Sequence, residues 1–123
     1  MALMKPTLLI VDDHAAFRSL ARRLLTAGGF EVVGEAADGH AAIAAVPQLR
    51  PDVVLLDIQL PDIDGFDVAA RLRDGEAEPV VVLISTRDRA DYGPRVERCG
   101  ARGFIPKDEL SAAAIRSLLG ATG

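Results

Sequence analysis

The sequence has no tryptophan, a single cysteine and few aromatic residues, and each shortage excludes something. Aromatic residues make up only 4% of the 123 residues whereas half are hydrophobic, so the core must consist mainly of Val, Leu, Ile and Ala. One cysteine, Cys99, excludes an internal disulfide and any metal site made of several cysteines, and it suits a reducing compartment. A core of aliphatic residues is typical of a buried parallel sheet covered by helices.

The sequence also lacks an excess of positive charge and any long apolar run. Its 14 Lys and Arg residues are outnumbered by 18 Asp and Glu residues, which gives a formal net charge of −4. A nucleic-acid surface needs clustered basic charge, so we expect no direct nucleic-acid binding, and the acidic balance mildly favours a cation site. No run reaches the roughly 18 apolar residues of a membrane span, and the leader of residues 1–6 is too short for a signal peptide. We therefore expect a cytoplasmic protein without membrane contact.

Short apolar runs alternate with helical patterns along the chain. The expected strands are 7–11, 30–34, 53–56, 80–84 and 103–105, and the expected helices are one ended by Gly28 and those at 38–48, 66–74, 88–99 and 108–119. Strict alternation of this kind implies parallel strands, right-handed crossovers and helices on both faces. The prediction is one α/β domain over residues 1–123 with its core at 7–119. It is a flavodoxin-like, doubly wound sheet of five parallel strands in the order 2-1-3-4-5, with five helices.

Polar side chains follow four of the five expected strands. The carboxyl ends of parallel strands share one edge of the sheet, where ligands bind in open α/β folds. Aspartates that converge there repel one another, and a divalent ion with oxygen ligands would complement them. Mg²⁺ fits best because it binds through one or two carboxylates and keeps waters for phosphate oxygens. The set therefore predicts a site for an anion held by a metal, built from Asp12 and Asp13 after the first strand, Asp57 at the end of the third, Ser85 after the fourth, and Lys107 after the fifth.

Each of these residues also has a plainer interpretation. Asp57 would then only cap a turn, Asp12 or Asp13 the first helix, and Ser85 the fourth helix. A lone lysine after a strand is usually solvated, as Lys107 would be. These interpretations are reasonable singly, and it is the placement of all five residues at one edge that favours a site.

Other polar residues are better explained as structural. His14 is interpreted as a residue in the first turn of a helix. Asp62, Asp64 and Asp67 lack the glycine placement and distal glutamate of a calcium-binding loop. We interpret them as solvated loop acids, with Asp64 capping the third helix.

The edge residues together resemble the receiver domain of two-component response regulators, over nearly the whole chain. The resemblance implies that Asp57 is the phosphoacceptor and takes its phosphoryl group from the phosphohistidine of a sensor histidine kinase or phosphotransfer protein. It also implies a Mg²⁺ ion bound by Asp13, Asp57 and the backbone carbonyl of Gln59, with Asp12 assisting through a water. The motifs that carry it are Asp12-Asp13, Asp57 with Pro61 and Gly65, Ser85, and Phe104-Ile105-Pro106-Lys107.

The same resemblance implies a switch. Lys107 would pair with the phosphoryl group, Ser85 would hydrogen-bond it, and Phe104 would swing inward. The surface of the fourth helix, fifth strand and fifth helix would then change and control a partner, an output domain or a phosphorylation-dependent homodimer. Asp12-Asp13-His14 and Val33-Gly34-Glu35-Ala36 look like the subclass fused to a helix-turn-helix DNA-binding domain, so DNA would be contacted by that domain and not by this chain. Such a chain is a phosphoacceptor that assists its own phosphorylation and dephosphorylation, not an enzyme.

Two other classes of function are alternatives to the receiver domain. A Mg²⁺-dependent phosphohydrolase of the haloacid-dehalogenase type also uses an aspartyl nucleophile after a strand. That class needs a second aspartate two residues later, where this chain has Gln59, and a cap domain, for which the sequence has no segment. A purely structural interaction domain is disfavoured by the full set of polar residues at one edge.

Overall fold

The computed structural model describes residues 5–120, so the outer residues of the expected domain and most of the leader lie outside the described part. Five parallel strands form one sheet in the order β2-β1-β3-β4-β5, which confirms the predicted topology. The strands are β1 (Thr7–Val11), β2 (Glu31–Ala36), β3 (Val53–Asp57), β4 (Val80–Ser85) and β5 (Gly103–Pro106).

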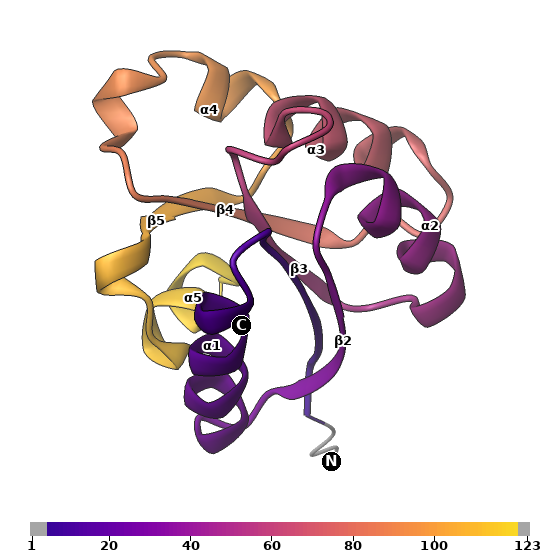
Figure 1. Ribbon diagram of the computed structural model, residues 1–123, viewed down its shortest axis with the longest axis vertical. Helices are drawn as coiled ribbons and strands as arrows, with labels where there is room; N and C mark the ends of the chain where they lie inside the picture. The colour runs from indigo at the N-terminus through magenta and orange to yellow at the C-terminus, as the bar shows by residue number, and fades with distance from the viewer. Residues whose placement is uncertain (1–4, 121–123) are drawn as a thin grey trace.

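Helices cover both faces of the sheet (Figure 1). One face carries α1 (Ala15–Ala27) and α5 (Ala112–Leu118). The other carries α2 (Gly39–Leu49), α3 (Gly65–Asp74) and α4 (Arg95–Arg98). None of the helices in residues 5–120 combines the length and apolarity that crossing a bilayer demands.

The core has two halves, one on each side of the sheet. Side chains alternate along a strand, so Val54 and Leu56 of β3 pack against α2 and α3, whereas Val53 and Leu55 pack toward α1 and α5. All five residues of β3 are buried. Burial on both faces explains why the strands appear in the sequence as continuous apolar runs. It agrees with the position of β3 as the central strand of the sheet.

Local capping fixes where three helices begin. The side chain of Asp38 accepts a hydrogen bond from the Ala41 amide at 2.7 Å, and that of Asp64 accepts one from the Asp67 amide at 3.0 Å. These contacts satisfy amides that have no partner within the helix. They make Asp38 the N-cap of α2 and confirm Asp64 as the N-cap of α3. Ser111 does the same for α5 by accepting from Ala114.

The predicted fourth helix is wrong over most of its length. In place of a helix at 88–99 the structure has a 3-10 turn (Arg89–Asp91) and the four-residue α4. Gly93 adopts a left-handed conformation with φ of 61°, and Pro94 follows, which together interrupt a continuous helix. Residues 86–99 are called the β4–α4 segment below.

The predicted fifth helix also begins too early. Residues 107–109 form a 3-10 turn, and α5 begins only after the cap at Ser111.

Ser85 is the last residue of β4, so its interpretation as the cap of a fourth helix is wrong. The predicted bounds of β1 are confirmed, and those of the other four strands differ from the structure by one or two residues at one or both ends.

Candidate functional site

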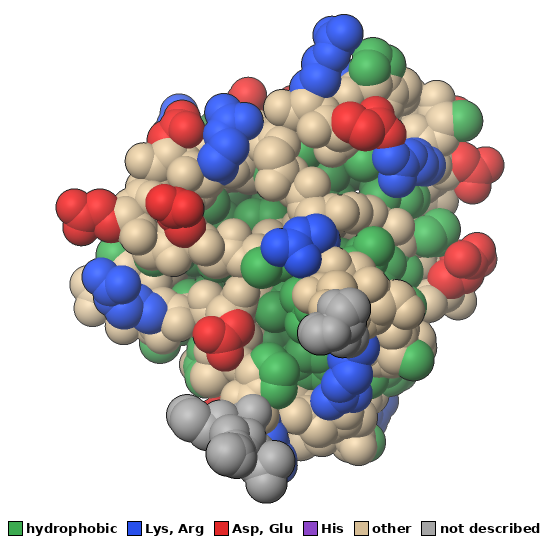
Figure 2. All heavy atoms as spheres, turned by 180° about the vertical axis from the view of Figure 1, so that it is seen from behind, with side chains coloured by type: hydrophobic (Ala, Val, Ile, Leu, Met, Phe, Trp, Pro, Cys, Tyr) green, Lys and Arg blue, Asp and Glu red, His purple; other side chains and the backbone are tan. Residues whose placement is uncertain are grey.

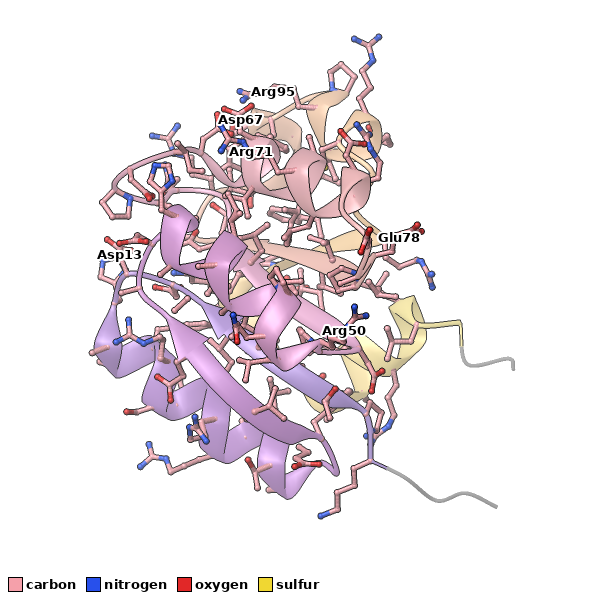
Figure 3. The ribbon with its side chains drawn as sticks, turned by 90° about the vertical axis from the view of Figure 1, so that its right-hand side faces the viewer. Asp13, Arg50, Asp67, Arg71, Glu78 and Arg95 are labelled. Atoms are coloured by element: carbon pink, nitrogen blue, oxygen red, sulfur yellow. The ribbon has the colours of Figure 1, made fainter. Side chains whose placement is uncertain are left out.

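The buried polar side chains among the described residues are Asp12, Asp57 and Ser85, and all three lie at the carboxyl edge of the sheet. Asp12 follows β1, Asp57 ends β3 and Ser85 ends β4. Figure 3 shows the neighbouring Asp13 at this edge, away from Arg50 and Glu78, which precede β3 and β4. Burial of charge is costly without partners, so the concentration of buried polar groups at one edge indicates a site.

Lys107 supplies the positive charge at this edge. Its Nζ lies 2.5 Å from Oδ2 of Asp12 and 3.2 Å from Oδ2 of Asp57, and it sits 4.6 Å from the centre of the Phe17 ring. Burial by itself lowers the pKa of the Lys107 ammonium, but the carboxylates of Asp12 and Asp57 outweigh burial, so the pKa is raised. Lys107 is therefore a fixed cation beside two buried acids, and its interpretation as a solvated lysine is wrong.

The carboxylate of Asp57 is held by two donors. The backbone amide of Gln59 donates to Oδ1 at 3.1 Å, and Lys107 contacts Oδ2. Burial nevertheless raises the pKa of Asp57, and the negative charge of Asp12 adds to that effect, while Gln59 and Lys107 oppose it. A carboxylate whose charge is disfavoured in this way is stabilised by a further cation.

The start of α3 packs directly against this strand end. The amide of Gly65 donates to the Ile58 carbonyl at 2.8 Å. A β-carbon at Gly65 would lie 2.5 Å from the carbonyl oxygen of Asp57 and 2.7 Å from the α-carbon of Ile58. Only glycine allows this close approach, which explains the Gly65 of the motif and keeps the loop around Asp57 compact.

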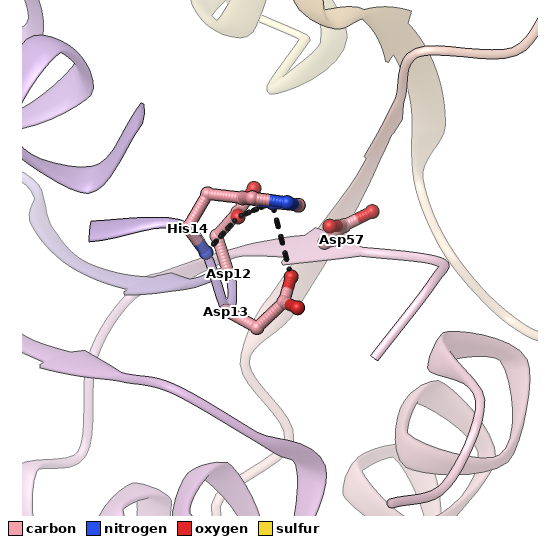
Figure 4. Close-up of side chains that lie close together, drawn as sticks. All are labelled: Asp12, Asp13, His14 and Asp57. Atoms are coloured by element: carbon pink, nitrogen blue, oxygen red, sulfur yellow. Dashed lines mark hydrogen bonds and ion pairs between the residues drawn. The ribbon is translucent and has the colours of Figure 1, made fainter. Parts of the chain in front are cut away.

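Asp12, Asp13, His14 and Asp57 form one cluster (Figure 4). One potential ligand atom from each lies within 4.8 Å of the others. Carboxylate oxygens dominate this set, and a hard divalent cation such as Mg²⁺ prefers oxygen ligands, so the residues fit the ion that was predicted. Gln59 lies two residues after Asp57 and contacts it through its backbone amide.

His14 lies closer to these acids than its interpretation as a first-turn residue implies. It occupies the N-cap position of α1, and its Nδ1 atom lies 3.2 Å from Asp12 and 3.1 Å from Asp13. Asp12 accepts a hydrogen bond from the backbone amide of His14 at 2.8 Å, so Asp12 also shapes the turn into α1. The interpretation of Asp12 or Asp13 as the cap of α1 is therefore wrong, because His14 is the N-cap and no side chain caps this helix.

Ser85 is turned toward an aromatic side chain that the sequence analysis missed. Its Oγ lies 2.6 Å from the hydroxyl oxygen of Tyr92, and it accepts a hydrogen bond from the Arg87 amide at 3.0 Å. The Tyr92 ring packs between the rings of Phe66 and Phe104, with centroid distances of 5.5 Å and 6.1 Å. Phe104 therefore lies beside Tyr92. The sequence offered one sign of this contact, a lone tyrosine seven residues after Ser85. Because residues 88–99 were predicted to form a regular helix, no contact between Tyr92 and Ser85 was expected.

Asp62 is an exposed loop acid, as expected, but its carboxylate also makes contacts that were not predicted. It accepts hydrogen bonds from the amides of Gly39 and His40 at the start of α2, both at 2.8 Å, and from the amide of Ile63. These amides lower the pKa of Asp62 to about 2 against the opposing effect of desolvation. The contact ties the loop after Asp57 to the start of α2.

Comparison with known proteins identifies the family. A model of the response regulator receiver domain matches residues 8–119. The chain belongs to this family. The resemblance noted from the motifs is therefore confirmed, and so is the function of a receiver domain in two-component signalling, for which phosphorylation of an aspartate is the general mechanism. The match leaves the phosphohydrolase and the purely structural domain without support.

Individual relatives agree with this assignment. The transcriptional regulatory protein NarL of Mycobacterium tuberculosis is 38% identical over 116 residues, which cover 94% of this chain and 54% of that protein. The solved signal receiver domain of that NarL superimposes with a TM-score of 0.86 at 37% identity, covering 96% of this chain and 99% of that one. The DNA-binding transcriptional activator EvgA of Escherichia coli is 31% identical over 101 residues, which cover 82% of this chain and 50% of that protein.

A third relative is known in a complex. A structure of CheX and CheY with BeF3 and Mg²⁺ from Borrelia burgdorferi matches with a TM-score of 0.81 at 26% identity, covering 94% of this chain and 87% of that one. The chain spans about half the length of NarL and EvgA.

Proposed function

We propose that Asp57 is the residue of this receiver domain that is phosphorylated. The observation that carries the proposal is the environment of its carboxylate, which is buried at the end of the central strand with Lys107 3.2 Å away. Asp12 is committed to Lys107 and to the turn into α1, and Asp13 is exposed at the rim. Asp12 is fully buried and both its oxygens are engaged, one by the His14 amide and one by Lys107. Asp57 combines the neighbouring cation with a carboxylate that remains slightly exposed.

The chemistry needs little beyond positioning and charge neutralisation. A carboxylate oxygen of Asp57 attacks the phosphorus of a phosphohistidine and forms a new P–O bond as the P–N bond breaks. The imidazole nitrogen leaves with the electron pair and takes up a proton. Lys107 faces the oxygens on which negative charge gathers, and its raised pKa keeps it protonated at neutral pH.

Asp13, Asp57 and the backbone carbonyl of Gln59 would hold Mg²⁺ at this carboxylate, with Asp12 assisting through a water. The bound ion would neutralise charge on the phosphoryl oxygens. The oxygen-rich cluster supports this ligand set, and so does the relative whose structure contains both BeF3 and Mg²⁺. Ser85 would donate a hydrogen bond to the phosphoryl group, and Phe104 would respond through its ring contact with Tyr92, whose hydroxyl lies beside Ser85.

The partners follow from the chemistry and from the relatives. The phosphoryl donor would be a sensor histidine kinase or a phosphotransfer protein, in the cytoplasm. Two relatives are named as regulators of transcription, and one as DNA-binding, so the output would be a DNA-binding domain in the part of the protein that this chain does not span. The face seen in Figure 2 has basic and acidic side chains interspersed, which suits a module that does not itself bind DNA. Phosphorylation would change the surface of α4, β5 and α5 and favour a homodimer or a partner complex.

Phosphorylation of the isolated chain tests the assignment of Asp57. Phosphoramidate supplies a P–N bond like that of phosphohistidine, and borohydride reduction of the product marks the modified aspartate for peptide mapping. We expect one label at Asp57, none in Asp57→Asn, and normal labelling in Asp67→Asn, which removes an exposed carboxylate of α3. Undiminished labelling of Asp57→Asn would assign the phosphoryl group to another residue.

A further inference from the structure

Tyr92 approaches the site from the β4–α4 segment. Its hydroxyl oxygen lies 2.6 Å from Oγ of Ser85, which is fully buried. Its ring is fixed edge-on against Phe66 of α3, at an interplanar angle of 67°, and tilted against Phe104 of β5. The Ser85 hydroxyl, which is expected to contact the phosphoryl group, is therefore already in contact with Tyr92.

The direction of this hydrogen bond follows from the partners of Ser85. A serine hydroxyl has one hydrogen to donate and two lone pairs that accept. The amide of Arg87 occupies one lone pair at 3.0 Å. Either hydroxyl could donate in the contact with Tyr92. Within residues 5–120 the structure gives Oγ no partner besides Arg87 and Tyr92, so donation to the Tyr92 oxygen is the arrangement that gives the buried hydrogen of Ser85 an acceptor.

We propose that Tyr92 is a positioning residue that holds the Ser85 hydroxyl away from Asp57 until a phosphoryl group competes for it. The inference rests on the proposed function of Asp57. A charged phosphoryl oxygen is a stronger acceptor than a phenol oxygen, so Ser85 transfers its hydrogen bond once the group is present. Tyr92 then loses its partner, and the change passes to the Phe104 ring and to the β4–α4 segment.

This competition has a direct thermodynamic consequence. A contact made only in the unphosphorylated form stabilises that form relative to the phosphorylated one. Removal of the contact therefore shifts the equilibrium toward the phosphorylated form. Tyr92→Phe keeps the ring between Phe66 and Phe104 but lacks the hydroxyl. We expect Tyr92→Phe to bind beryllium trifluoride about three- to tenfold more tightly than the parent in the presence of Mg²⁺, the equivalent of one hydrogen bond. Thr26→Val, which removes a remote exposed hydroxyl from α1, should bind like the parent.

The chain carries its own reporter for the test. Tyr92 is the only tyrosine and there is no tryptophan, so all tyrosine emission comes from Tyr92. Beryllium fluoride is titrated into the chain with Mg²⁺, its binding is followed by fluorine NMR, and tyrosine emission is recorded in parallel with Mg²⁺ alone as the baseline. Emission should change in proportion to occupancy in the parent and in Thr26→Val. It should not respond in Ser85→Ala, in which the Tyr92 contact is already absent.

The outcomes separate this inference from the proposed function. Binding of beryllium fluoride without any change in emission, or with equal affinity in Tyr92→Phe, would overturn the role of Tyr92 and leave Asp57 as the phosphoacceptor. Weaker binding by Tyr92→Phe would also overturn it, since Tyr92 would then support the hydrogen bond of Ser85. Absence of binding by every folded variant would refute the proposed function and this inference with it.

Discussion

The carboxyl ends of β1 and β3 and the neighbouring β4–α4 segment are built in opposite ways. Every residue of β3 is buried, and the acids at the strand ends are paired with Lys107. In the β4–α4 segment only Val96 and Cys99 are buried, Tyr92 is half-buried and the other residues are exposed. Its helix has four residues, against 13 in α1. Segments with few buried contacts open at low free-energy cost. The ends of β1 and β3 with Lys107, called the rigid region below, therefore hold the chemistry. The β4–α4 segment, called the loose region, carries the conformational response.

The largest effect is expected from a substitution that disrupts the ion pairs of the rigid region. Lys107→Met keeps a long side chain but leaves two buried carboxylates without their cation. Loss of one partner from a buried ion pair costs roughly 3–5 kcal/mol, and we expect a decrease of that size in the free energy of unfolding measured with denaturant. Lys5→Met, which alters the exposed lysine before β1, should change it by less than about 0.5 kcal/mol. The loss should be smaller in an Asp57→Asn background, and an equal loss there would contradict the pairing of Lys107 with Asp57.

Mg²⁺ should strengthen the same region. An ion that binds only the folded state stabilises it by about 2.7 kcal/mol at 100 times its dissociation constant. Melting temperature should therefore rise with added Mg²⁺ in the parent and in Asp67→Asn. Asp13→Asn removes one proposed ligand and should flatten this response, and a rise equal to that of the parent would place the ion elsewhere.

Asp57 itself should destabilise the fold at neutral pH. Its folded-state pKa is raised above the ordinary 3.8, so between these two values the folded chain binds more protons than the unfolded chain. Stability therefore falls as pH rises through that window and stays reduced above it. Asp57→Asn, with Lys107 still paired to Asp12, should melt at a higher temperature than the parent at pH 7 without Mg²⁺. The advantage should shrink as pH is lowered toward 3.8, and an Asn variant that is less stable at pH 7 would contradict the cost assigned to the buried charge.

The smallest effect on stability is expected for Asp62, which lies in the loop that follows β3. Its pKa is lowered to about 2 in the folded chain against 3.8 as the ordinary value. The stability that it contributes is therefore present above pH 3.8 and lost as pH falls toward 2. Asp62→Asn should be slightly less stable than the parent at pH 6, with a difference that narrows in acid. A constant difference across pH in thermal unfolding would mean that the charge of Asp62 has no part in the contact.

The sequence predicted the rigid region better than the loose one, for physical reasons. Continuous apolar runs such as that before Asp57 have one simple solution, a strand buried on both faces, and the caps at Asp38 and Asp64 are local contacts. The Gly93-Pro94 break was visible in the sequence, yet the surrounding charged residues suggested a regular helix. The contacts of Asp62 with α2 and of Tyr92 with Ser85 depend on how separate elements pack, and no local pattern encodes them.

Amide hydrogen exchange with and without beryllium fluoride, in the presence of Mg²⁺, tests the division between the two regions most directly. The account predicts that exchange changes in the β4–α4 segment and around Phe104, while β1 and β3 keep the slow exchange of a buried sheet. A bound mimic that leaves exchange in the β4–α4 segment unchanged, or that alters β1 and β3 as much as that segment, would contradict the account.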